Sequence, residues 1–340
     1  RNLIINGAMN VAQRGTSSTS GNYQTVDRFY PDWNGTDEAM TQAQVDVTAD
    51  TDPWNLGFRK ALKLTNGNQT SGAGAADDGY ILYRLEAQDI ANCGWDYTST
   101  SSYITYSFWV KSSVAQTFYG VWSTHDGTSK AYPISFALSA DTWTKVTGSI
   151  PGVSGLQFDN NNAHGLDLRI YTFLGTDKTA SGVSLNTWAN TNWSERTPDY
   201  TSTWWTTNDA TFELTGFQLE VGSTATEFEH RTYGDELARC KRYYQQYPEI
   251  AADGYAPYPG SGVAIMTTTS AGWAMNYDTM RAAPTVSWSG NHRMVEINTD
   301  RAVTGFAAHH GSASTGWMVI TASGGGMTAG NAAIVGRNND

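Results

Sequence analysis

The stretch YITYSFWVKSS, residues 103–113, alternates two sets of side chains with a period of two. Successive side chains of a β-strand point to opposite faces, so each set occupies one face. One set is Ile104, Tyr106, Phe108 and Val110, and the other is Thr105, Ser107, Trp109 and Lys111. The pattern predicts a half-buried antiparallel strand that places the first set on a core.

Three further stretches repeat this alternation, namely WTKVTGSI (143–150), LDLRIYTFLG (166–175) and ATFELTGFQLEVG (210–222). In the last of them Phe212, Leu214 and Gly216 are expected on one face. Clusters of Gly, Asn, Asp, Ser and Thr separate the strands, which is typical of two-sheet sandwiches. We therefore expect an all-β chain with a jelly-roll β-sandwich over residues 1–231.

The stretch HRTYGDELARCKRYYQQY (230–247) is the one convincing helix. Thr232 can cap its N-terminus, with Asp235 three residues further on. The side chains spaced for one face are Leu237, Cys240, Tyr244 and Tyr247, and Pro248 ends the pattern. The sequence predicts a short connecting helix over 232–248. Regularly spaced short apolar runs then predict a smaller C-terminal β domain over 249–340.

The composition argues against some classes of partner. The 340 residues carry a formal net charge of -11, with 16% charged and 12% aromatic side chains. Nucleic-acid binding needs clustered Lys and Arg, and no such cluster is present. No run of 18 apolar residues occurs, so we expect no membrane insertion. Cys93 and Cys240 lack a metal or redox spacing and are expected to be ordinary thiols.

The segment EFEHR sets Glu227 and Glu229 beside His230. In a strand, the two carboxylates would share one face. Glycosidases need two carboxyls that flank the scissile bond, about 5–10 Å apart. No second element that could face these glutamates is identifiable, so we interpret the segment as a joint in which Phe228 plugs the end of the sandwich. The sequence predicts no catalytic residue and therefore a protein that is not an enzyme.

The histidines do not predict a transition-metal site. His125, His164, His230 and His292 are scattered, and the adjacent His309 and His310 would point to opposite faces of a strand. The turns at 74–80 and 157–167 could offer oxygen ligands to calcium, but ordinary turns need the same residues. Calcium stays open as an alternative. No phosphate-binding or dinucleotide-binding motif occurs, so we expect no cofactor.

Tryptophans in polar loops are the strongest signal outside the strands. Indole faces stack on the apolar patches of sugar rings, while neighbouring Asn, Asp and Gln side chains hydrogen-bond the hydroxyls. We expect about half of these rings to cover the ends of the sandwich core instead. The glycan-binding candidates are Trp33, Trp54, Trp188, Trp193, Trp204 and Trp205.

Several segments together resemble bacteriophage tail-fibre and other virion appendage proteins of the marine and cyanobacterial type. They are NLIINGAMNVAQRGTS (2–17), VDRF (26–29), YSFWVKSS (106–113), WTKVTGSIPG (143–152), LTGFQLEVGSTATEFEHRTYGDELARCKRYYQQY (214–247) and MRAAPTVSW (280–288). The first segment also resembles, more distantly, the opening strand of jelly-roll carbohydrate-binding modules. Those modules usually have an acidic residue that helps to hold a structural ion where this chain has Ala8 and Met9. The resemblance therefore does not imply a structural ion in this chain.

The resemblance implies a homotrimeric virion protein that contacts other virion proteins and recognises a host cell-surface glycan. The leading hypothesis is therefore a receptor-binding adhesin in a tail or capsid appendage. One alternative is a structural capsid fibre or adaptor that has no ligand of its own. Another is a depolymerase of surface polysaccharide, although no long parallel β-helix repeat is present.

Overall fold

The computed structural model describes residues 2–246, 256–257, 260–267, 269–287, 292–296, 299–324, 327 and 332–337. The chain divides into two compact units, Arg1–Cys240 and Lys241–Asp340. This division falls inside the segment 232–248, which the sequence predicts as a connecting helix.

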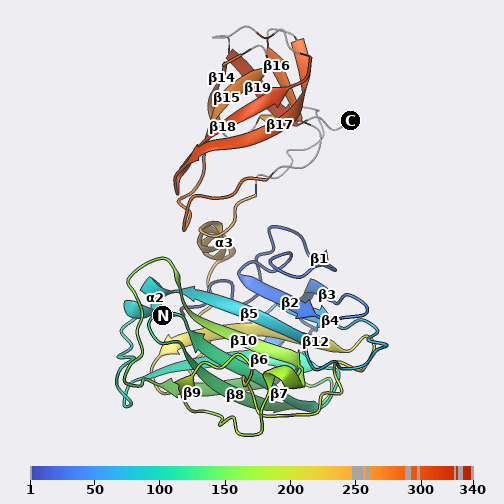
Figure 1. Ribbon diagram of the computed structural model, residues 1–340, viewed down its shortest axis with the longest axis vertical. Coiled ribbons are helices and arrows are strands. Elements are labelled where there is room, and N and C mark those ends of the chain that lie inside the picture. The colour runs from blue at the N-terminus through green and yellow to red at the C-terminus, as the bar shows by residue number, and fades with distance from the viewer. Residues whose placement is uncertain are drawn as a thin grey trace. The chain divides into compact units, whose positions relative to one another are not determined.

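The first unit contains two six-stranded antiparallel sheets (Figure 1). Sheet A has the order β1-β3-β4-β12-β6-β9, and sheet B has the order β11-β8-β7-β10-β5-β2. The strands are β1 (Ser17–Ser18), β2 (Phe29–Asn34), β3 (Thr41–Asp46), β4 (Lys60–Thr65), β5 (Asp78–Glu86), β6 (Tyr103–Ser112), β7 (Gln116–Thr124), β8 (Lys130–Leu138), β9 (Thr144–Pro151), β10 (His164–Leu174), β11 (Ala189–Asn190) and β12 (Thr211–Val221).

Eight of these strands form four nested antiparallel pairs: β4 with β12, β5 with β10, β6 with β9, and β7 with β8. The first and third pairs lie in sheet A, and the second and fourth lie in sheet B. The chain therefore changes sheet with each successive pair, which is the strand arrangement of a jelly roll. The predicted jelly-roll β-sandwich is confirmed.

The main core lies between the two sheets. Phe108 of β6 and Phe212 of β12 in sheet A pack there with Phe118 and Trp122 of β7 in sheet B. The alternation in 103–113 correctly predicts this inner face, because Ile104, Tyr106, Phe108 and Val110 are all core residues.

The other face of β6 is also buried, so the half-burial predicted for this strand is wrong. Trp109 belongs to a second apolar cluster on the outer face of sheet A, together with Phe58 and Trp143. Phe228 packs on this cluster, with its ring centroid 4.8 Å from that of Phe58. Phe228 therefore covers the outside of a sheet and does not plug the end of the sandwich.

A β-bulge in β12 changes the predicted alternation. The register with β6 shifts between Thr215 and Gln218, and Gly216 has a φ of 63°. A bulge adds one residue to a strand and moves the following side chains to the opposite faces. Phe217 and Leu219 consequently join Phe212 in the core, and the inward position expected for Gly216 is corrected to a bulge.

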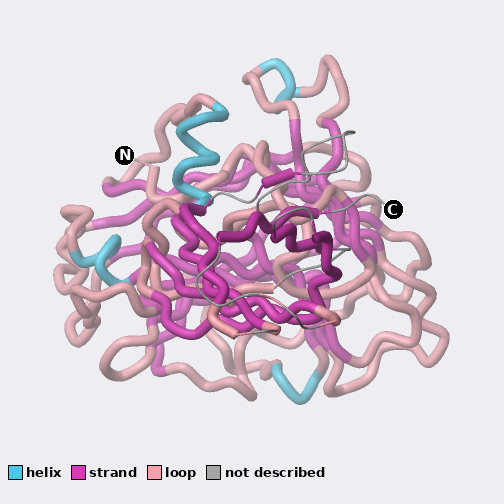
Figure 2. The backbone as a smooth tube through the Cα atoms, turned by 90° about the horizontal axis from the view of Figure 1, so that it is seen from above, coloured by secondary structure: helices cyan, strands magenta, loops and turns pink. Residues whose placement is uncertain are grey.

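The helices in the described part of the chain are short (Figure 2). They are α1 (Asp52–Asn55), α2 (Ala87–Ala91) and α3 (Tyr233–Lys241), with a 3-10 turn at Thr176–Lys178. Thr232 caps α3 as predicted, since its Oγ1 accepts a hydrogen bond from the Asp235 N–H at 3.2 Å. The helix ends at Lys241, earlier than expected, while Tyr247 and Pro248 lie outside the described residues. Among the described residues, no helix combines the length and the apolar character needed to cross a membrane.

The buried face of α3 contains an acid that the helical pattern did not predict. Glu236 and Cys240 are buried, whereas Leu237 is only half-buried. The Glu236 carboxylate accepts hydrogen bonds from the Asn6 N–H at 2.6 Å and from Arg231 Nη1 at 3.1 Å. The helix is thereby fastened to the N-terminal segment of the first unit.

The second unit is a seven-stranded antiparallel sheet with the order β13-β19-β14-β15-β18-β17-β16, and β19 also pairs with β16. A C-terminal β region is therefore confirmed. Residues 284–287, which lie within the predicted β domain 249–340, are outside its strands. The strands are β13 (Ala256–Pro257), β14 (Gly260–Ile265), β15 (Ser270–Asn276), β16 (His292–Glu296), β17 (Thr299–Gly311), β18 (Thr315–Ala322) and β19 (Ala332–Arg337).

Candidate functional site

The outer face of sheet B carries aligned rows of aromatic and charged side chains. Strand register places Asp32, Tyr80, Tyr171 and Tyr119 side by side across β2, β5, β10 and β7. The next row contains Tyr30, Leu82, Arg169 and Val121. Cross-strand neighbours in one row lie about 4.5–5.5 Å apart at their Cβ atoms. Leu82, Val121 and Tyr171 in these rows are buried.

Contacts within this face hold its rings in place. Tyr80 donates a hydrogen bond from its hydroxyl to Asp32 Oδ2 at 3.2 Å, and its ring lies 6.0 Å from that of Tyr171. Burial and the charge of Asp32 raise the pKa of Tyr80, so this hydroxyl stays protonated and remains a donor. Tyr30 lies between the Tyr23 ring at 5.0 Å and the Arg84 guanidinium at 5.1 Å.

Trp193 extends this face from the loop 191–200. Its indole is 43% exposed, and two guanidinium groups contact the ring, Arg169 at 4.9 Å and Arg196 at 5.2 Å from its centroid. In the same loop, the Tyr200 ring lies 4.7 Å from the Tyr119 ring. Cations over an indole are attracted by the negative face of the ring, so these contacts fix an exposed aromatic plate. We call the outer face of sheet B together with this loop the aromatic face.

The loop is fastened to the sandwich at both ends. Near its start, the Thr191 N–H donates to the Ser129 carbonyl at 2.9 Å. Near its end, Thr197 forms an isolated β-bridge with Thr179, whose hydroxyl donates to Asp199 at 2.6 Å. A loop held in this way presents Trp193 in a preformed position, which lowers the entropic cost of binding.

The six predicted tryptophans do not form one site. Trp33 and Trp188 are half-buried and pack on the main core, and Trp188 Nε1 donates to the Pro151 carbonyl at 2.8 Å. Trp54 packs on the cluster outside sheet A, beneath the Arg59 guanidinium at 4.4 Å. Trp193 is therefore the one predicted tryptophan on the aromatic face.

Trp204 and Trp205 are corrected from glycan candidates to core residues. Both are 0% exposed. Their Nε1 atoms donate to the backbone carbonyls of Thr211 and Gly72, each at 3.0 Å. A fully buried indole with a satisfied N–H has no surface left for a sugar. The polar residues around this pair suggested exposure, but the loop folds its two indoles inward.

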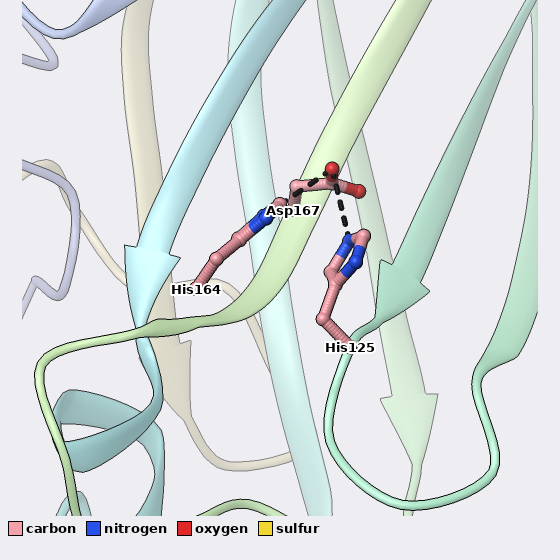
Figure 3. Close-up of side chains that lie close together, drawn as sticks. All are labelled: His125, His164 and Asp167. Carbon is pink, nitrogen blue, oxygen red and sulfur yellow. Dashed lines mark ion pairs between the residues drawn. The ribbon is translucent and has the colours of Figure 1, made fainter.

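The fold also gathers His125, His164 and Asp167, which the sequence left apart (Figure 3). His125 directly follows β7, and the other two residues belong to β10. The Nε2 atoms of His125 and His164 lie 3.2 and 3.4 Å from Asp167 Oδ2, and the two rings stack with centroids 3.7 Å apart. Within the described part of the chain, this is the one group of three His, Cys, Asp or Glu side chains whose ligand atoms lie within 4.8 Å of one another.

Burial and neighbouring groups shift the pKa values of Asp167 and His164 in this cluster. Burial alone would raise the pKa of Asp167, but its contacts with both histidines and the charge of Arg169 lower it to about 2. Burial lowers the pKa of His164, which favours the neutral imidazole. The cluster thus combines a carboxylate with an imidazole that favours its uncharged form.

The segment EFEHR makes structural contacts after β12. The segment leaves β12 as a loop and is not a strand. Glu229 accepts a hydrogen bond from the Asn2 N–H at 2.6 Å, and His230 Nε2 lies 2.9 Å from the Leu56 carbonyl. Glu229 and His230 thus have structural contacts at the end of the first unit.

The tyrosines and arginines of the aromatic face were missed by the sequence analysis. The signal was present in part, because LDLRIYTFLG alternates Asp167, Arg169 and Tyr171 with apolar residues. Period two separates the faces of one strand, but it does not show which strands lie side by side. The nesting of β5, β7 and β10 supplies that information.

No protein-family model and no curated protein matches the chain. Solved structures give weak similarities. A xylan-binding domain from Paenibacillus barcinonensis is 13% identical over 62% of this chain and 94% of its own, with a TM-score of 0.29. The N-terminal cellulose-binding domain of β-1,4-glucanase C from Cellulomonas fimi is 10% identical over 64% and 99%, with a TM-score of 0.30. A provisionally described sugar-binding protein from Bacteroides thetaiotaomicron is 13% identical over 65% and 100%, with a TM-score of 0.34.

Proposed function

We propose that the first unit binds a carbohydrate on the aromatic face. The observation that carries this proposal is the 43% exposed Trp193 indole, which contacts Arg169 and Arg196 on the face that also contains Tyr80 and Tyr119. Stacking on an aromatic plate suits the C–H faces of a sugar ring, and guanidinium groups and tyrosine hydroxyls can hydrogen-bond its hydroxyls.

The surrounding chemistry favours binding over bond cleavage. Two carboxylates are named on this face. Asp32 accepts a hydrogen bond from the Tyr80 hydroxyl, and Asp167 forms an ion pair with Arg169. A glycosidase needs one carboxyl that can donate a proton to the leaving oxygen, so the low pKa of Asp167 does not suit that role.

We further propose that the chain acts as an adhesin in a phage virion appendage. This step rests on the resemblance of the segments 2–17, 214–247 and 280–288 to phage fibre proteins. It implies a homotrimer that is joined to other virion proteins and recognises a host cell-surface glycan.

The experiment compares two half-exposed tryptophans on opposite sheets of the sandwich. Immobilised bacterial surface polysaccharides are probed with the wild-type chain, Trp193→Ala and Trp54→Ala. We expect Trp193→Ala to weaken binding at least tenfold and Trp54→Ala to retain it. The scale is that of a nucleic-acid base stacking on one aromatic side chain, about 1–3 kcal/mol. Loss of binding in Trp54→Ala alone would move the site to the other sheet.

Other outcomes separate the alternative functions. If the wild-type chain binds no glycan but is found on imaged virions, the structural fibre or adaptor is favoured. If new reducing ends are released from the polysaccharide, the chain is a depolymerase. A monomer in solution would contradict the trimeric fibre.

A further inference from the structure

We propose that His125, His164 and Asp167 bind one divalent transition-metal ion of the zinc class. Two imidazole nitrogens and one carboxylate oxygen would supply three ligands, leaving the fourth position of a tetrahedral ion to water. This inference does not depend on the proposed carbohydrate function.

The spacing of the donor atoms fits such an ion. With metal–ligand bonds of about 2.0–2.1 Å, two ligands of a tetrahedral zinc ion lie roughly 3.3 Å apart. The two Nε2···Oδ2 distances in the cluster are 3.2 and 3.4 Å. Both imidazoles approach the same oxygen (Figure 3), so small movements of the rings would let all three atoms point at one centre.

The same atoms lack good hydrogen bonds. His125 Nε2, His164 Nε2 and Asp167 Oδ2 are buried, and none has a hydrogen-bond partner of acceptable geometry among the described residues. Buried polar atoms without partners are costly, and three of them meet here. Arg169 Nη1 forms an ion pair with Oδ2 at 3.0 Å, but its hydrogen bond goes to the other oxygen, Oδ1, at 3.2 Å. Oδ2 is therefore close to a positive charge but still accepts no hydrogen bond.

The backbone holds the two strand ends in register. The His125 N–H donates to the Gly165 carbonyl at 3.0 Å, and Leu166 pairs with Thr124. The backbone hydrogen bond to Gly165 places His125 directly after β7, and pairing with Glu86 of β5 places His164. The side chains of these histidines are 23% and 29% exposed, so an ion can reach them from solvent.

The ligand types select the class of ion. Calcium and magnesium prefer oxygen ligands, whereas imidazole suits zinc, copper and nickel. The hydrogen bond from Arg169 to Oδ1 is the kind of outer contact that commonly orients a ligating carboxylate. Arg169 also contacts the Trp193 ring, so metal binding would stabilise one edge of the aromatic face.

The test is a titration of the chelator-treated full chain, without a polyhistidine tag, with cobalt(II) chloride. We expect one bound cobalt ion per chain, with the visible absorption of a four-coordinate site. His125→Ala and His164→Ala should each weaken the affinity at least tenfold, because losing even a group that only orients a ligand typically costs about 10–100-fold. The matched control is His230→Ala, which removes a histidine outside the cluster and should bind cobalt as the wild type does.

Two results would overturn the proposal. One is the absence of saturable cobalt binding to the folded wild-type chain, with the fold checked by near-ultraviolet circular dichroism. The other is unchanged affinity in both His125→Ala and His164→Ala. Either single variant could lose its fold, so the melting temperature of the wild-type chain with and without zinc chloride provides a second measurement. We expect zinc to raise this temperature, and no rise would also contradict the proposed site.

Discussion

The two classes of tryptophan differ at the scale of a single residue. Trp204 is fully buried and its Nε1 is hydrogen-bonded, whereas Trp193 is exposed on the aromatic face. We predict that Trp204→Ala destabilises the first unit by about 3–5 kcal/mol, since it leaves a cavity in the main core. Trp193→Ala should change stability by less than about 1 kcal/mol. Urea unfolding followed by circular dichroism measures both, and equal losses would contradict the assignment.

A second prediction concerns the cysteines, which are both free thiols. Cys240 is 1% exposed, and burial, followed by the nearby charges of Asp27 and Glu236, raises the pKa of its thiol. The thiolate is the reactive form, so native Cys240 should resist alkylation at pH 8. We expect iodoacetamide, read by mass spectrometry of peptides, to label Cys240 only after denaturation. Labelling of Cys240 in the native protein at the rate of a free peptide thiol would contradict this.

At the scale of elements, glycine shows what strand periodicity cannot predict. Gly216 has a φ of 63°, and an added Cβ would lie 2.7 Å from a ring atom of Phe58. We predict that Gly216→Ala destabilises the sandwich by more than about 1 kcal/mol through backbone strain and this clash. The matched control is Gly234→Ala in α3, where the added Cβ meets nothing within 4 Å. That change should stabilise the helix by about 0.5–1 kcal/mol, because alanine favours a helix more than glycine does. Thermal unfolding measures both changes, and we expect a lower melting temperature for Gly216→Ala and a higher one for Gly234→Ala.

The same elements show which features of the fold can be predicted from the sequence. Alternation correctly predicted the inner face of β6, and the Thr232 cap correctly placed the start of α3. The alternation could not predict the bulge at Gly216, because a glycine in a sequence is equally typical of a turn. The burial of Trp109 likewise depends on Phe58, which a segment distant in sequence brings to the outer face of sheet A. Local pattern therefore predicted strands and their core face, while long-range pairing determined the candidate sites.

At the scale of the whole molecule, the core of the sandwich is contained in the first unit. All strands of sheets A and B lie before residue 222, and α3 is fastened to the N-terminal segment by Glu236 and Arg231. Arg231 Nη1 donates to the Ile4 carbonyl at 3.0 Å and to Glu236 at 3.1 Å. A domain that holds its own core and its own strand pairs can fold alone.

We predict that a fragment of residues 1–246 folds cooperatively, whereas a fragment of residues 1–230 is measurably less stable. The shorter fragment keeps every strand of the sandwich but lacks Arg231 and Glu236, so the Asn6 N–H and the Ile4 carbonyl lose their partners. Leaving buried backbone groups unpaired costs about 1–3 kcal/mol each. Urea unfolding of the two fragments measures the difference, and Glu236→Gln in the longer fragment tests whether the ion pair contributes to it. Equal midpoints for both fragments would show that α3 does not stabilise the sandwich, and a longer fragment without a cooperative transition would show that the first unit needs the rest of the chain.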